Sequence, residues 1–278
     1  MREIIDGYTE GHYALPDPVV QHHRALEAVR AIEAAGALPV DHLLAEAKNQ
    51  LIQELIGSSL AGKPDVPDDE KLSDIRRQAE AKRDLWEIRY EAERQLERRL
   101  GGAIREHAHD VLKNLRGALN RVMKEARVAA DKLEGLPIDA SADALALAPK
   151  SARDAWETLT RLSESYCAVF AAYRKLPLNL PPVSADVVGI EFKDDDRLWP
   201  ERSRVRTRAF IAAQHAQPGA DRPVAPPWPE QFPAKLLWII RHNATPWLPD
   251  AAELDAHLER VVAQRREKRA GRAAVWTR

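Results

Sequence analysis

A long stretch without proline constrains this chain more than any other feature of its sequence. From Asp68 to Glu134 there are 67 consecutive residues without a proline, and Gly135 follows directly. Proline interrupts helix interiors, whereas glycine is common just past a helix end, so the stretch predicts helix throughout. One unbroken helix of this size would be about 100 Å long. Because Gly101 and Gly102 are adjacent, we expect a kink or a break at that point.

Apolar residues recur along this stretch with the spacing of one helix face. The stripe begins at Leu85 and Ile88 and ends at Leu133, covering 48 residues in 13 steps, a period near 3.7. A left-handed coiled coil needs a period of 3.5, so this face predicts a nearly straight helix. Residues 150–176 carry a second stripe whose period is 3.5, which is typical of a helix packed along one partner. That stripe consists of Ala155, Leu159, Leu162, Tyr166, Val169, Tyr173 and Leu176.

These patterns predict a mainly α-helical fold built around a long antiparallel hairpin. Roughly residues 68–134 would lie against residues 150–176, because the intervening loop, residues 135–149, is short enough to bring the two helices together. Shorter helices are expected before the hairpin, at residues 18–35 and 40–56. The alternation of strands and helices that marks α/β folds is absent from this part of the sequence.

The sequence changes character after residue 176. Twelve of the 19 prolines lie between Pro177 and Pro249, and five of the seven tryptophans lie at or after Trp199. We therefore predict two domains: a helical domain over residues 1–176, which contains the hairpin, and a Pro/Trp-rich portion over residues 177–278.

The Pro/Trp-rich portion is expected to contain an extended arm and two helices. Residues 217–233 include six prolines and favour an extended, polyproline-like conformation. A short helix that is apolar on all sides follows, up to Asn243, and must be buried in a core or an interface. The last helix begins at Asp250, with Glu253 placed three residues later as in a capping box, and it continues into a basic tail.

The arm is predicted to lie on a protein surface, because a segment so rich in proline cannot form a core of its own. We favour a surface on a neighbouring subunit; the competing interpretation is that the arm packs on the helices of its own chain. Trp228 lies between two prolines and is the expected anchor. The predicted protein-interface residues are Trp228, Phe232, Leu237, Trp238 and Trp247.

Charge is unevenly distributed along the chain. The net charge is −1, but the residues from Arg197 onward carry 15 Lys and Arg against 8 Asp and Glu, a net of +7. A basic segment neutralises phosphates, so nucleic-acid binding through the C-terminal portion is the alternative function; a solvated helix end is the simpler explanation. The predicted nucleic-acid-binding residues are Arg202, Arg204, Arg206, Arg208, Arg265, Arg266, Lys268, Arg269 and Arg272.

The sequence carries no recognisable catalytic motif. Phosphate-binding glycine patterns and the GxSxG pattern are both absent. The single cysteine, Cys167, follows the stripe residue Tyr166, so we expect a buried thiol rather than a nucleophile. His107 and Asp110 have the spacing of a helical ligand pair, but a third ligand would have to come from elsewhere. We therefore expect no catalytic residue, no metal site, no cofactor and no enzymatic activity.

The expected function is that of a non-enzymatic structural or assembly protein in a large multi-subunit complex. A bacteriophage virion or head-assembly component is one such protein, by analogy at the level of the fold. The expected partners are protein subunits, further copies of this chain among them, and no membrane, because no apolar run approaches the ~20 residues that a spanning helix needs. The N-terminus is charged where a secretion signal is apolar, so the expected location is the cytoplasm or a virion-like particle.

Removal of residues 265–278 is predicted to leave the fold intact, because this basic tail has no apolar stripe of its own. If the tail contacts nucleic acid, the truncated chain will bind with a flatter dependence on salt concentration, measured by titration at increasing salt. Absence of binding by the full chain at ~50 mM salt, where phosphate contacts are strong, would eliminate this role.

Overall fold

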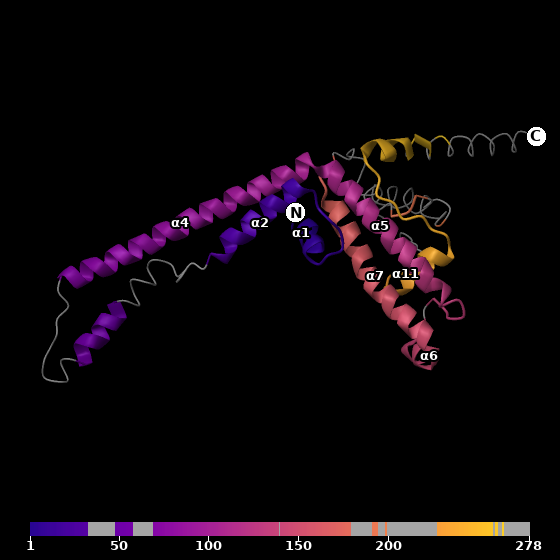
Figure 1. The fold of residues 1–278 in the computed structure, drawn as a ribbon, viewed down its shortest axis with the longest axis horizontal. Helices are drawn as coiled ribbons and strands as arrows, with labels where there is room; N and C mark the ends of the chain where they lie inside the picture. Colours follow the sequence, from indigo (N-terminus) through magenta and orange to yellow (C-terminus); the bar gives the residue numbers. More distant parts are fainter. Residues whose placement is uncertain are drawn as a thin grey trace, which may run out of the picture. The chain divides into compact units, whose positions relative to one another are not determined.

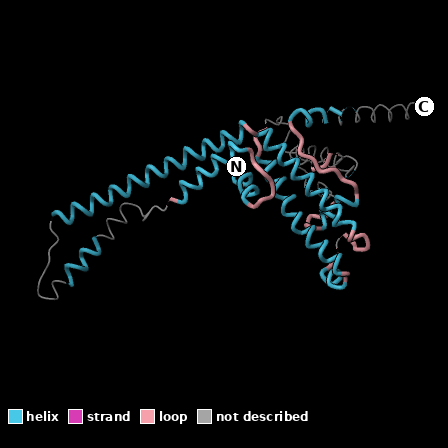
Figure 2. The backbone as a smooth tube through the Cα atoms, in the orientation of Figure 1, coloured by secondary structure: helices cyan, strands magenta, loops and turns pink. Residues whose placement is uncertain are grey.

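The described chain is mainly helical, as the sequence predicts (Figures 1 and 2). It divides into two compact units, one formed by Met1–Pro16 with Arg105–Arg278 and the other by Asp17–Ile104. The predicted domain boundary at residue 176 lies inside the first unit. None of the helices in the described part of the chain is long and apolar enough to span a membrane. The computed structural model describes residues 1–32, 48–57, 69–138, 140–178, 191–193, 198, 227–257, 259–260 and 263.

The first unit is centred on an antiparallel pair of helices, α5 (Ala108–Asp131) and α7 (Lys150–Lys175), which lie side by side in Figure 1. All seven residues of the second predicted stripe are buried, and Leu159 and Val169 are fully so. The α5 stripe is buried as well, from Ala108 to Leu133. The predicted hairpin is thus confirmed, and its apolar faces supply the core of this unit.

The connection between these helices contains a short helix, α6 (Ala142–Leu147), where the sequence predicted a loop. The Ser141 hydroxyl accepts a hydrogen bond from the Ala144 backbone N–H at 3.2 Å, so this helix has a side-chain N-cap.

The N-terminal helix α1 (Arg2–Thr9) was also missed, and it packs on α7. Its Ile4 is fully buried, and the Tyr13 hydroxyl donates to the Ile4 carbonyl at 2.9 Å. A Cβ on Gly7 would lie 2.7 Å from the Tyr13 ring, so the close approach of the ring requires glycine here. The eight residues of α1 are too few for a clear periodicity, which is why the sequence did not reveal this helix.

The described C-terminal segments pack on the same hairpin. The predicted short apolar helix is α11 (Ala234–Arg241), whose Leu236, Leu237 and Ile239 are fully buried and which contacts α5 and α7. The helix over residues 251–257 begins with the predicted capping box: Asp250 and Glu253 each accept, through the side chain, the backbone N–H of the other, at 2.9 and 3.0 Å.

The second unit contains α2 (Asp17–Ala31), a helical segment over residues 48–57 and most of α4 (Asp69–Glu106). The first of these confirms the helix predicted at residues 18–35, as far as the described residues reach. The helix predicted at residues 40–56 is described from residue 48 onward, and its earlier part lies outside the described residues.

The long helix is interrupted at a different place from the one predicted. Gly101 and Gly102 are both helical within α4, and the interruption falls at His107, whose φ of −101° and ψ of 22° are not helical. Glycine lowers helix stability by about 1 kcal/mol, a cost that the burial of the neighbouring Leu100 and Ile104 offsets. His107 has no residue-type signal that marks it as a break.

Substitution of Leu159 by Asp is predicted to lower the free energy of unfolding by about 3 kcal/mol or more, because an unpaired charge would replace a fully buried side chain. The measurement is chemical denaturation followed by circular dichroism. The matched control is Leu147→Asp, since Leu147 in α6 is 89% exposed. Equal midpoints for both variants would contradict the buried seam.

Candidate interaction surface

The predicted interface residues make contacts inside the first unit. The Trp228 ring centroid lies 5.1 Å from that of Phe192 and 5.7 Å from that of Trp238. Trp238 and Leu237 are buried in α11. The Phe232 ring lies 5.8 Å from Tyr166, and the Trp247 ring lies 5.2 Å from His257. Residues 217–226 of the predicted arm lie outside the described residues. The contacts of its described part are made within its own chain, and contact of the same residues with another subunit stays a prediction.

A buried polar cluster joins these segments to α7. One carboxylate oxygen of Glu191 accepts the Tyr166 hydroxyl at 2.7 Å, and the other accepts the Lys235 ammonium at 2.7 Å. Glu191 and Lys235 are each 13% exposed, and Tyr166 is fully buried. Next to Glu191, Phe192 forms an antiparallel bridge with Pro246, closed by the Lys193 N–H bond to the Thr245 carbonyl at 2.9 Å. The cluster therefore fixes residues 191–193 and α11 to α7.

The chemistry of this cluster indicates a structural role. Each carboxylate oxygen of Glu191 accepts one hydrogen bond, and together the two bonds hold the carboxylate between Tyr166 and Lys235. Burial, followed by the negative charge of Glu191, raises the pKa of Tyr166 well above its ordinary value, so the phenol stays protonated and donates. Cys167, expected to be buried, is instead exposed, because it lies about 100° around the helix from Tyr166. Burial of part of its thiol nevertheless raises the pKa of Cys167, which makes it a poor nucleophile.

The other sequence candidates contribute no site within the described residues. His107 Nδ1 lies 3.5 Å from an Asp110 carboxylate oxygen, but no group of three potential ligands in the described part of the chain is placed to hold a metal ion. All nine arginines and lysines predicted to bind nucleic acid lie outside the described residues, so that role stays a prediction.

The second unit exposes apolar side chains on α4. Leu85 and Ile88, the first two residues of the predicted stripe, are each 67% exposed. Every residue from 80 to 88 is exposed. Ala81 is also exposed and Ala92 is half-buried on the same side of the helix. We call Ala81, Leu85, Ile88 and Ala92 the α4 apolar face.

Two aromatic residues of α4 lie outside this face. Trp86 and Tyr90, which are 45% and 48% exposed, stack on each other with ring centroids 5.2 Å apart and planes within 6°. Arg94 extends over the Tyr90 ring at 5.8 Å. These three side chains therefore partly cover one another, whereas no such contact is found for Leu85 or Ile88 within the described residues.

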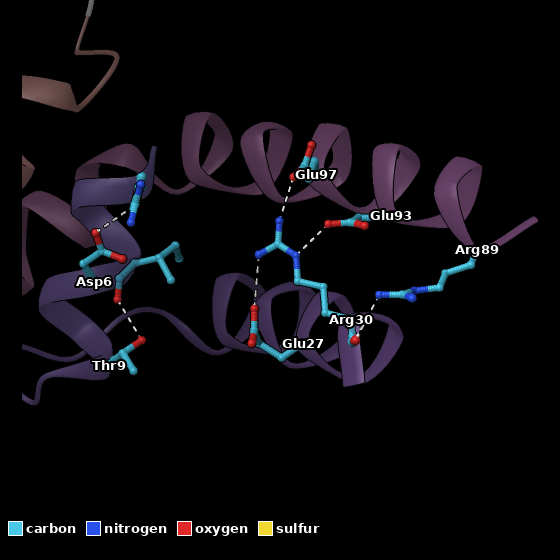
Figure 3. Close-up of polar contacts among 9 residues, drawn as sticks. Asp6, Thr9, Glu27, Arg30, Arg89, Glu93 and Glu97 are labelled. Atoms are coloured by element: carbon cyan, nitrogen blue, oxygen red, sulfur yellow. Dashed lines mark hydrogen bonds and ion pairs between the residues drawn. The ribbon is translucent and has the colours of Figure 1, made fainter. Parts of the chain in front are cut away.

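Ion pairs hold α2 on another side of α4 (Figure 3). The Arg30 guanidinium bonds Glu93 at 2.7 Å, Glu97 at 2.8 Å and Glu27 at 3.2 Å. Arg89 donates to the Arg30 carbonyl at 3.1 Å. Hydrogen bonding to Glu93 raises the pKa of Arg30 above its ordinary value. These contacts involve α4 from Arg89 onward, so the exposed stretch 80–88 lies immediately before them in the chain.

The residues of the α4 apolar face were not among the predicted site residues, although Leu85 and Ile88 begin the predicted stripe. The stripe from Leu85 to Leu133 was treated as one face, but burial of its larger side chains begins at Leu100. A signal was present, because charged residues surround Leu85 at positions 82, 83, 84 and 87, which is typical of a solvated helix.

Comparison with known proteins adds no constraint on this surface, since no protein family, curated protein or solved structure matches the chain.

Substitution of Glu191 by Gln is predicted to lower the free energy of unfolding by about 2–4 kcal/mol, because it leaves the mostly buried Lys235 ammonium without its counter-charge. Thermal and denaturant unfolding measure the loss. Glu157→Gln on the exposed side of α7 is the matched control. The double variant Glu191→Gln, Lys235→Met should recover part of the loss, and additive losses would show that the pair does not act as a unit.

Proposed function

We propose that this protein is a non-enzymatic structural or assembly subunit of a larger complex, and that the α4 apolar face is a surface to which a neighbouring subunit binds. The observation that supports this is the exposure of Leu85 and Ile88, 67% each, on a stretch of helix whose residues are all exposed. The assembly proposed from the sequence, a virion-like particle, is retained as part of the proposal.

Hydrophobic free energy favours covering such a face. Burying a Leu or Ile side chain completely contributes about 1.5–3 kcal/mol. A partner that covers both Leu85 and Ile88, which are exposed here, would therefore gain a few kcal/mol of binding free energy. Single exposed apolar residues are common on protein surfaces and need no explanation. Two large aliphatic residues within one helical turn, flanked on the same side by alanines, are the pattern that a partner helix recognises.

The surroundings of the face also support a binding role. Isolated helix is marginally stable in water, and most helical stability in proteins comes from packing of an apolar face. Residues 80–88 have no such packing in the described chain. A partner that covers Leu85 and Ile88 would therefore stabilise the helix as well as the complex.

The proposal is tested with the chain in its source. We expect the native chain to belong to a particle whose mass, measured by native mass spectrometry, exceeds that of the purified recombinant chain. A Leu85→Asp, Ile88→Asp double variant is predicted to be lost from that particle, because charge at these two positions cannot be buried without cost. Val128→Asp is the control, since Val128 is an exposed aliphatic residue of α5. A native chain with the mass of the recombinant one would contradict the proposed function.

A further inference from the structure

We propose that the middle of α5 binds the phosphate backbone of a nucleic acid through four basic side chains on its exposed side. We call these residues the α5 basic row: Lys113, Arg121, Lys124 and Arg127. The inference goes beyond the function proposed above and does not depend on the α4 apolar face. Three observations carry it: the sign of the exposed charges, their lack of ion pairs within the described part of the chain, and the polar surface between them.

Positive charge predominates over the middle of α5. In the stretch 111–130, all of which the structure describes, the exposed cations are the four residues of the α5 basic row, and Glu125 is the one exposed carboxylate. Asp110 and Asp131 are also exposed, but they lie near the two ends of the helix. Clustering of Lys and Arg along one side of a helix is typical of surfaces that bind polyanions.

The dipole of the helix does not explain this row. Basic residues are favoured in the last turn of a helix, because the last backbone carbonyls lack intrahelical partners there. The last turn of α5 contains no basic residue, and the row ends one turn before the helix does. The cations therefore occupy positions where the helix itself does not stabilise them.

The row also lacks counter-charges from the protein. Within the described part of the chain, none of its four residues takes part in an ion pair, whereas Arg116 on the other side of α5 pairs with Glu253. Helix α4 is different, because several of its exposed arginines pair with a carboxylate of the same helix. These are Arg77, Arg83 and Arg98. An external anion is thus the counter-charge that the α5 basic row can still accept.

Repulsion within the row favours such an anion. Lys124 is three residues from both Arg121 and Arg127, a spacing at which like charges on a helix repel each other. Glu125 does not separate them, because it lies about 100° around the helix from Lys124. A bound phosphate backbone would lower this repulsion along the whole row.

The surface between the cations favours a nucleic acid over an acidic protein. The other exposed residues from 113 to 127 are Gly117, Asn120 and Glu125, so no large apolar side chain is exposed in this stretch. Protein partners usually bury an apolar centre from which water is excluded, and this surface offers none. Lysine, arginine and asparagine side chains all donate hydrogen bonds to phosphate oxygens.

The length of the row is sufficient for several phosphates. From Lys113 to Arg127 the helix rises about 21 Å at 1.5 Å per residue. Each strand of duplex DNA carries one phosphate per about 3.4 Å of helix axis, so it presents several phosphates over this length. Contacts to phosphate do not read the base sequence. We therefore expect binding that is independent of sequence and steeply dependent on salt.

Fluorescence anisotropy tests the proposal, with a labelled DNA duplex of about 20 base pairs titrated by the purified full chain at several salt concentrations. The variant is the triple substitution Lys113→Gln, Arg121→Gln, Lys124→Gln, since glutamine is also a good helix former. Each lost phosphate contact reduces the slope of log affinity against log salt by about 0.9, so the slope should become less steep by about 2–3. At low salt the dissociation constant should rise about tenfold or more.

The matched control is the triple variant Arg76→Gln, Lys82→Gln, Arg99→Gln, which removes the same charge from exposed positions of α4. Its salt dependence should equal that of the unsubstituted chain. A full chain that does not bind the duplex at ~50 mM salt would overturn the inference. A salt dependence that the α5 variant leaves unchanged would overturn it as well, because binding would then involve another part of the chain.

Polyglutamate of similar charge is the second probe, because an acidic protein is the competing partner. We expect the α5 substitutions to weaken binding of the duplex more than binding of polyglutamate. The opposite result, weaker binding of polyglutamate with unchanged binding of the duplex, would assign the α5 basic row to an acidic protein and overturn the inference.

Discussion

The apolar seam between α5 and α7 is the interaction on which the rest of the first unit depends. Leu159, Val169 and Leu115 are fully buried along it, and α1, α6 and α11 each contact one or both of its helices. Because this seam has an uninterrupted stripe on both helices, it needs no polar pairing to fix its register. The segments that pack around it are shorter and cannot be stable alone, so the hairpin provides the surface on which they fold.

Polar contacts then fix the C-terminal segments to that hairpin. Glu191 links Tyr166 of α7 with Lys235 of α11, Arg116 of α5 pairs with Glu253, and the Tyr173 hydroxyl donates to the Pro249 carbonyl at 2.7 Å. Hydrogen bonds with strict geometry select one position for segments that have little secondary structure. The second unit uses a different means, because Arg30 joins α2 to α4 through two carboxylates, Glu93 and Glu97, at a partly exposed site, and it also pairs with Glu27 of its own helix.

The sequence predicted the long, strongly periodic elements and missed those whose formation depends on tertiary contacts. The α7 stripe and the capping box at Asp250 follow from local spacing, so both were predictable. Helix α1 depends on the Tyr13 contact with Gly7, and the Glu191 cluster joins residues 25 and 44 positions apart in the sequence, which no local pattern reveals. The same limit applies to the α4 apolar face, because a stripe shows which residues share a face and not whether another segment covers it.

The α5–α7 seam is complete within one chain, whereas we propose that a partner subunit covers the α4 apolar face. Hydrogen–deuterium exchange followed by mass spectrometry, applied to the purified chain and to the chain in the particle from its source, tests both parts in one measurement. We predict strong protection of α5 and α7 in both states, and stronger protection of residues 80–88 in the particle than in the purified chain. Equal protection of residues 80–88 in the two states would contradict the proposal.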